Sequence, residues 1–499
     1  MFRRGAPPDA TYTFKHALVQ DAAYDSLLKS KRSQLHAQIA ETLERNFLDT
    51  VRNEPDLLAH HFTHANLYGR AVPYWIAAGR KAMNHVALAE AIGHLKTALK
   101  TIDLLPENRE REQQELSARV LLGTAYLAFL GWAAREAVQV LEPAQNLATR
   151  LGQNDQLVVI RYYLWFHHAM RCEYEPALAA SGQLDELARS LERSPWSAVA
   201  RFAECMTACW MGDFKHARTA GDELLRSYVA ERHGPLVHTF NHDMKAGALS
   251  WAGFWLWALG HPDQARQAAV EQRDLARRQT HPFNLCWSLT GGTAALLLRG
   301  ETTAALEWTA EAYAVADDNG LGFMRDVMVP YWAGYSLIEQ GNFSEGEAQH
   351  GPALKVWRGT GALQMIPFSN MMLSKALIGL RRLHEAASLL DEALELASQT
   401  GHRIAEAEIH RVRGELELRQ PKCNLHAAQA CFMKALRVAQ SQNAKGWELR
   451  AATSLARLWK HQGQTREAYE LLASVYNWFT EGFDTKDLKE AKALLEELG

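Results

Sequence analysis

The sequence predicts an all-α fold, a right-handed superhelical solenoid of stacked helix pairs, and two observations carry this prediction. A small residue recurs after each break between helical runs, at spacings of 46, 40, 40, 48, 40, 41, 40, 41 and 41 residues. A fixed period of about 40 residues is typical of helical repeats, in which each pair buries its apolar face against the next. The chain of 499 residues is also 47% hydrophobic, which excludes wholesale disorder, while a single core of this length is unusual. The recurring residues are Ala91, Ala137, Ala177, Ala217, Ala265, Ala305, Gly346, Ala386, Ala427 and Ala468.

Residues 1–68 lack this period, so we expect them to form a separate small helical module. Residues 1–11 are rich in Pro and Gly and read as a linker. One helix is expected over 17–28, a second over 35–43 with Leu or Ile at i, i+4 and i+8, and a third over 54–65.

The repeat array is expected over 69–480, and a polar capping helix rich in Lys and Glu over 481–499. Breaks inside the array contain Gly, and at Gly212-Asp213 and Gly341-Asn342 the Gly is followed by Asp or Asn. Glycine adopts the left-handed conformation that ends many helices. The small residue one turn into the second helix of each pair lets two backbones approach closely, where a Leu would push them apart.

The residues around position 330 indicate the class of repeat. Tyr331, Trp332, Gly334 and Tyr335 precede a Gly-Asn-Phe break and then a Glu-Gly step. The period alone favours HEAT-like units of roughly 40 to 47 residues over tetratricopeptide units of about 34. The order of aromatic, Gly and small residues instead resembles the tetratricopeptide pattern with lengthened helices. We therefore expect a tetratricopeptide-like array.

Composition places the chain among soluble proteins of a reducing compartment. The formal net charge of −3 includes no basic stripe, so no nucleic-acid partner is predicted. The longest apolar runs, such as 248–260, are shorter than the ~18 residues that span a bilayer, so no membrane partner is predicted. The cysteines form no Cys-x-x-Cys pair, and we expect buried or half-buried thiols in the cytoplasm. They are Cys172, Cys205, Cys209, Cys286, Cys423 and Cys431.

No catalytic or cofactor motif is found. The chain contains no Gly-x-x-x-x-Gly-Lys-Ser/Thr phosphate loop and no Gly-x-Ser-x-Gly nucleophile elbow. No Ser/His/Asp set or carboxylate pair stands out. We predict that the chain is not an enzyme and binds no cofactor.

Two pairs of residues have metal-ligand spacing on a helix. His60 and His64 lie at i, i+4, as do Cys205 and Cys209. No acidic ligand accompanies the histidines, so a structural or surface role is the simpler interpretation, and the cysteines fit a packed helix face. A hydrolase or metal enzyme based on His60, His64 and the tryptophan cluster is a further, weaker alternative.

Fifteen tryptophans invite a binding hypothesis. Helical spacing places most of them in the core, yet some could line an exposed concave patch for a peptide or ligand. The candidate interaction surface consists of Trp251, Trp255, Trp287 and Trp332.

Several segments resemble a known protein context. Residues 14–24 (FKHALVQDAAY), 58–61 (LAHH), 74–79 (YWIAAG), 90–92 (EAI) and 481–491 (EGFDTKDLKEA) look like parts of one family. This family consists of bacterial signalling proteins in which an adenylate/guanylate cyclase domain precedes a STAND/AAA-type ATPase and a tetratricopeptide array. The resemblance covers nearly the whole chain and is most specific at its two ends. The family's Walker A loop and cyclase aspartates have no counterpart here, so no catalytic residue carries over.

The resemblance implies a non-catalytic interaction and sensor array. It would bind a protein partner or a small-molecule ligand on its concave face and regulate an ATPase or cyclase, in the same or another polypeptide. The alternative is a stand-alone scaffold, or an adaptor like those of transcription regulators, with no link to nucleotide chemistry.

Overall fold

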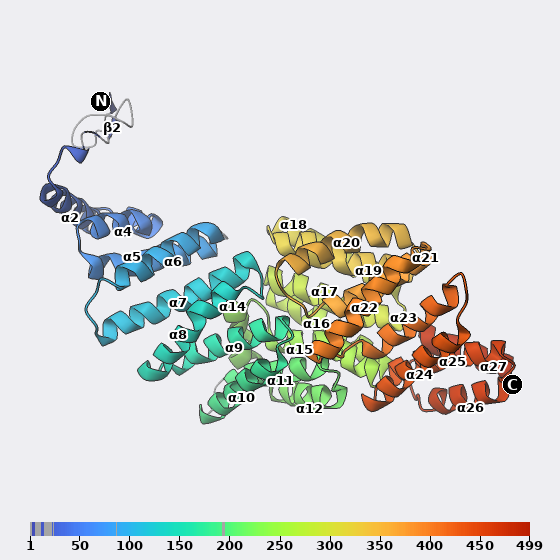
Figure 1. Cartoon of the computed structure of the whole chain (residues 1–499). Helices are drawn as coiled ribbons and strands as arrows, with labels where there is room; N and C mark the ends of the chain where they lie inside the picture. The colour runs from blue at the N-terminus through green and yellow to red at the C-terminus, as the bar shows by residue number, and fades with distance from the viewer. Residues whose placement is uncertain (1, 5–10, 14–21, 23, 86, 192–194) are drawn as a thin grey trace. The chain divides into compact units, whose positions relative to one another are not determined.

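The computed structural model describes residues 2–4, 11–13, 22, 24–85, 87–191 and 195–499. Its contacts divide the chain into two compact units, Met1–Ile160 and Arg161–Gly499, called unit 1 and unit 2 below. The predicted all-α class is confirmed, since antiparallel helix pairs follow one another along the chain (Figure 1). One short element was not predicted: strands β1 (Phe2–Arg4) and β2 (Thr11–Thr13) pair antiparallel, with Phe2 opposite Thr13.

Unit 1 contains the predicted N-terminal module and the first helix pairs. Most of the helix expected over 17–28, and most of the resembling segment 14–24, lies outside the described residues. Helices α2 and α4 pack on α5 through a shared core of Ala40, Leu58, Phe62 and Ala71. The described helices before residue 68 thus pack against the first helix of the array, and the separation of residues 1–68 as a module stays a prediction. The helices are α2 (Lys29–Asn46), α3 (Leu48–Asn53), α4 (Pro55–His64), α5 (Tyr68–Asn84), α6 (Leu88–Ile102), α7 (Arg109–Leu130), α8 (Arg135–Leu151) and α9 (Asn154–Met170), which crosses into unit 2.

Unit 2 continues the array to the C-terminus. A short insertion of α13, η1 and α14 accounts for the long spacing between Ala217 and Ala265, because it adds turns between two pairs. No described helix is long and apolar enough to cross a membrane. The helices are α10 (Tyr174–Ser190), α11 (Trp196–Trp210), α12 (Phe214–Ser227), α13 (Ala230–His233), η1 (Gly234–Leu236), α14 (Val237–Phe240), α15 (Met244–Ala258), α16 (Pro262–Gln279), α17 (Pro282–Arg299), α18 (Thr302–Asp318), η2 (Met324–Met328), α19 (Val329–Glu339), α20 (Phe343–Gly359), α21 (Ile366–Gly379), α22 (Leu383–Thr400), α23 (Glu406–Arg419), α24 (Leu425–Ser441), α25 (Lys445–His461), α26 (Thr465–Tyr476) and α27 (Lys486–Leu498).

The recurring small residues lie where the two helices of a pair cross. All ten fall in the second helix of a pair, from α6 to α26, and nine are buried. The exception is Ala427, which is half-buried, while Ala428 is fully buried. In that pair the side chain of Asn424 caps the helix, and the fourth residue after this cap is Ala428. The period was thus correct and its phase was off by one residue in the ninth pair.

The tightest crossing joins α19 and α20. A Cβ atom built on Gly334 would lie 2.7 Å from the backbone nitrogen of His350 and 2.8 Å from the carbonyl oxygen of Gly346. Both neighbours are helix backbone atoms and cannot move independently. Glycine is therefore required at this crossing for steric reasons.

Gly334→Ala should destabilise the protein by about 1–3 kcal/mol, the usual cost of overpacking a core. Gly351→Ala is the matched control, because a Cβ there meets nothing within 4 Å in the neighbouring helix α20. Gly351→Ala should stabilise the protein by about 0.4–1 kcal/mol, because it reduces the conformational entropy of the unfolded chain. Urea unfolding followed by circular dichroism measures both changes. Equal effects of the two substitutions would contradict the steric explanation.

Unit 2 coils so that pairs five positions apart touch. The carbonyl of Met170, which ends α9 in the third pair, accepts hydrogen bonds from the backbone of Leu363 and Gln364, just before the eighth pair, at 2.8 and 3.1 Å. The carbonyl of Trp210 in the fourth pair accepts one from Arg403, before the ninth, at 3.0 Å. Successive superhelical turns of unit 2 therefore lie in direct contact.

The same coiling fills the inside of unit 2. Phe254 of α15 contacts Phe368 of α21 and Trp447 of α25, and the rings of Trp257 and Trp447 lie 4.6 Å apart. First helices such as α15, α17 and α21 are buried on nearly all sides. A helix that is apolar all round is a buried helix. The inward face is thus largely a core.

Candidate functional site

Two of the four tryptophans predicted to form an interaction surface are buried. Trp255 is 1% exposed and Trp332 is 5% exposed, so neither ring is accessible to a partner. Trp255 packs against Gly221, where a Cβ would lie 2.6 Å from its ring. Trp251 and Trp287 are half-buried. The structure therefore corrects the predicted surface for Trp255 and Trp332, whose helices are core elements, and only Trp251 and Trp287 stay candidates.

The predicted cysteine environments are mostly as expected. Cys172, Cys205, Cys209 and Cys286 are buried, and Cys431 is half-buried. Burial raises the pKa of the Cys172 and Cys286 thiols to about 12, which suppresses the reactive thiolate. Cys423 is exposed, contrary to the expectation, because it lies in the turn before α24.

The histidine pair His60 and His64 belongs to a cluster of four in unit 1. Their rings lie 4.3 Å apart, and His36 of α2 stacks on His64 at 5.0 Å. The Nδ1 atoms of His36 and His61 lie 2.8 Å apart, and the Tyr24 hydroxyl lies 2.9 Å from Nε2 of His36. Both nitrogens of His36 are thus engaged within the protein. The cluster joins α2 to α4.

Burial, followed by the neighbouring histidines, lowers the pKa of His61 to about 4. The pKa values of His36 and His60 are lowered for the same reasons. A histidine whose folded pKa lies below its unfolded value of about 6.5 stabilises the fold above that value. The stability is lost as the pH falls from about 6.5 towards 4.

Acidification should therefore loosen the contact between α2 and α4. Between pH 7 and pH 5, the protection factors of these two helices, which correct amide hydrogen exchange for its intrinsic pH dependence, should fall more than those of α5 and α6. The variant His61→Asn should lose part of this pH dependence, since asparagine does not titrate. Unchanged pH dependence in the variant would show that His61 does not contribute.

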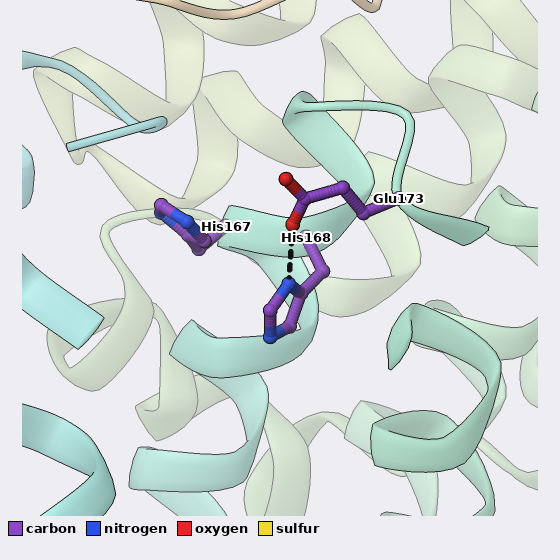
Figure 2. Close-up of side chains that lie close together, drawn as sticks. All are labelled: His167, His168 and Glu173. Atoms are coloured by element: carbon purple, nitrogen blue, oxygen red, sulfur yellow. Dashed lines mark hydrogen bonds and ion pairs between the residues drawn. The ribbon is translucent and has the colours of Figure 1, made fainter. Parts of the chain in front are cut away.

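His167, His168 and Glu173 form the one group in the described residues whose His and acidic donor atoms converge as metal ligands do, all within 4.8 Å of one another. Figure 2 shows His168 joined to Glu173, with the His167 ring to one side. Imidazole and carboxylate ligands suit zinc and related transition metals. The residues at the end of α9 and before α10 are those that could hold such an ion.

Two of these three residues already have strong partners. Nδ1 of His168 lies 2.8 Å from one oxygen of Glu173, and Nε of Arg171 donates to the other at 2.7 Å. The guanidinium beside the carboxylate opposes a cation electrostatically. The same residues fix the turn whose Met170 carbonyl binds Leu363 and Gln364. These contacts fit a structural role, in which the group holds the turn at the contact between superhelical turns, better than they fit a metal centre.

A charged network lies inside unit 2, and no motif in the sequence indicates it. Glu408 is 1% exposed and accepts bonds from Arg411 at 2.7 and 2.8 Å. Arg450 donates to Asp487 at 2.9 Å and lies over the Trp257 ring at 4.7 Å. Lys375 and Glu339 form a further ion pair beside this network.

The charged groups of the network stay ionised inside the protein because they are paired with groups of opposite charge. Burial works to raise the pKa of Glu408, but the nearby cations, Arg411 first, outweigh it and lower the pKa to about 2. Burial raises the pKa of Asp487 despite its bond to Arg450. A carboxylate such as Glu408, held ionised by fixed guanidinium groups, has no proton to give near neutral pH. The arrangement is therefore structural.

Glu408→Gln should destabilise unit 2 by roughly 3–5 kcal/mol, because removing one partner leaves buried guanidinium charge uncompensated. Glu470→Gln is the matched control: its partner Arg466 is 87% exposed, and no measurable change is expected. Thermal unfolding followed by circular dichroism compares the two variants. A Glu408 variant as stable as the control would show that the network adds nothing to stability.

Comparisons with known proteins do not assign the chain to a family. No family model matches the chain. An uncharacterised protein of Rhizobium meliloti (strain 1021) is 24% identical over 468 residues, which cover 91% of this chain and 44% of the relative. The chain thus spans less than half the length of this curated relative.

Two solved structures have partial similarity to this chain. One is a STAND ATPase with a tetratricopeptide repeat sensor from Pyrococcus horikoshii, at 17% identity and a TM-score of 0.39, covering 79% of this chain and 55% of that one. The other is the APC/C hetero-tetramer Cut9-Hcn1, at 13% identity and a TM-score of 0.48, covering 97% and 92%. The helix pairs of this chain by themselves define its fold.

Proposed function

We propose that this chain is a non-catalytic protein-interaction and sensor array that regulates an associated ATPase or nucleotide cyclase. The observation that carries the proposal is the coiling of unit 2, in which pairs five positions apart contact each other through backbone hydrogen bonds and packed aromatic rings. A partner that binds more tightly to an opened or closed coil shifts the balance between the two states. Such a shift changes the distance between the ends of the array, and thereby acts on a neighbouring domain.

Three features support a binding role over a catalytic one. Buried ionisable groups, such as Glu408 and Arg450, are paired with each other. The most buried cysteine thiols have raised pKa values. The inside of unit 2 is packed with aromatic side chains. The proposal places partners on the outer surface or at the turns, in preference to the concave face expected from the sequence.

The link to a nucleotide enzyme rests on the resemblance of residues 58–61, 74–79 and 481–491 to the array of cyclase–ATPase signalling proteins. The proposal also places the chain in the cytoplasm. Its six cysteines are free thiols, as in reducing compartments.

The test measures nucleotide hydrolysis or cyclisation by the enzyme encoded in the same or the adjacent reading frame. We expect turnover to change several-fold when the chain is present, and the effect to disappear with Glu408→Gln, which disrupts unit 2. Turnover that is equal with and without the chain would contradict regulation. If the chain then still captured a specific protein, it would be a stand-alone scaffold.

A further inference from the structure

The segment between α26 and α27 reaches back to the fifth and sixth helix pairs. Glu481 accepts hydrogen bonds from the backbone nitrogens of Asp263 and Gln264 at 2.9 and 3.1 Å. Its second oxygen accepts from Nε2 of Gln264 at 3.0 Å. The local cap residue of α16, His261, makes no side-chain cap bond. The first turn of α16 is therefore capped by a carboxylate from a distant part of the chain, at the helix end that attracts anions.

A second acidic residue of this segment binds a buried cation. Asp484 accepts from Nη2 of Arg299 at 3.1 and 3.3 Å. Arg299 is 3% exposed and also bonds Asp263 and Glu301, at 2.7 and 2.6 Å. The backbone nitrogen of Gly482 donates to Asp263 at 3.0 Å. The first turn of α16 and the Arg299 guanidinium, called the α16 site below, thus hold two carboxylates three residues apart.

An aromatic residue completes the contact. Trp478, three residues before Glu481, covers Gly260, where a Cβ would lie 2.3 Å from its ring. The ring also meets His261, with ring centres 6.0 Å apart, and the Lys445 ammonium, 5.6 Å from the ring centre. The bound segment therefore has the pattern Trp-x-x-Glu-Gly-x-Asp.

Much of the segment lies on the surface, whereas Phe479 is 6% exposed and belongs to the core around α26 and α27. The side chain of Asp484 is 72% exposed, Trp478 is 41% exposed and Phe483 is 49% exposed. Helices α26 and α27 share their own core, which includes Leu472, Leu488 and Leu494. Residues 480–484 can leave the α16 site while Phe479 and the two helices stay packed.

A surface hollow of about 790 Å³ adjoins the site, lined by four basic and four acidic residues. Asp484 is one of the acidic residues, so its departure leaves four cations facing three carboxylates. An emptied site would therefore attract an acidic segment. The residues are Arg266, Arg299, Lys486, Lys489, Asp263, Glu301, Asp484 and Glu490.

We propose that the α16 site is a recognition site for an acidic peptide of a partner protein, and that residues 477–485 occupy it in this chain as an internal competitor. The partner peptide presents Glu and Asp three residues apart, with an aromatic residue before them. Its binding displaces the segment and frees one of the contacts that close unit 2. This inference rests on the proposed interaction function and names its partner class.

The test uses a labelled synthetic peptide of residues 476–486 and the full-length chain, with fluorescence anisotropy as the readout. Glu481→Gln with Asp484→Asn weakens the internal competitor without altering the α16 site. We expect this double variant to bind the peptide at least tenfold more tightly than the unaltered chain. Glu467→Gln with Glu470→Gln, two exposed positions on α26, is the matched charge control and should behave as the unaltered chain does.

Two further arms locate the binding. A peptide carrying the same Glu-to-Gln and Asp-to-Asn changes should bind at least tenfold more weakly, since helix N-termini and guanidinium groups favour carboxylates. Gln264→Ala in the double-variant background should also weaken binding, because it removes one bond to Glu481. Binding should fall as salt rises.

The double variant could keep its melting temperature and still fail to bind the peptide. That result would overturn the proposal, and the contact of the segment with the α16 site would then be purely structural. Binding that is insensitive to the peptide's charge would overturn it as well. Either result leaves the proposed regulation untouched, since that is measured by nucleotide turnover. Conversely, the peptide could bind while nucleotide turnover is equal with and without the chain. That result would contradict the proposed regulation and retain the recognition site.

Discussion

Each helix pair depends on the close approach of its two helices at one small residue. Where Gly334 faces Gly346, the backbones are so near that a single added methyl group would meet main-chain atoms. A pair packed this closely behaves as a rigid unit, because protein interiors have few voids to absorb movement. Rigid units stacked with a constant rotation produce a regular coil. The contacts between pairs five positions apart, such as Trp210 with Arg403, are the consequence in unit 2.

The coil in turn decides which groups face solvent. Once first helices such as α15 and α25 meet across the inside, their tryptophans become core residues, and the ion network around Glu408 and Arg450 is enclosed with them. Some contacts that hold the coil lie at the turns and have one exposed partner, for example Asp484, which is 72% exposed and binds the buried Arg299. The surface contacts are the ones a partner can exchange, because they cost least to separate. The proposed recognition at the turns is consistent with a filled interior.

The helix pairs were predictable and most of the candidate sites were not. Periodicity located the small residue in all pairs, with an error of one position at Ala427, because helix crossing is a local requirement repeated in every unit. The histidine pair His60 and His64 was also visible from its spacing, but its partner His36 lies on another helix. Trp255 and Trp332 were misassigned because spacing shows that residues share a face and does not show what covers it. Their helices are apolar on all sides, a signal that indicates full burial.

The sequence by itself determined the all-α class, the repeat length and the places where helices end, because helix capping, glycine turns and apolar periodicity act within a few residues. The tertiary structure decided what the inside of unit 2 contains and which distant segments meet, as Glu481 meets the first turn of α16. A small rotation from one pair to the next accumulates over five pairs before two turns touch. No local pattern records that sum, so the contacts that follow from it appear only when the chain is folded.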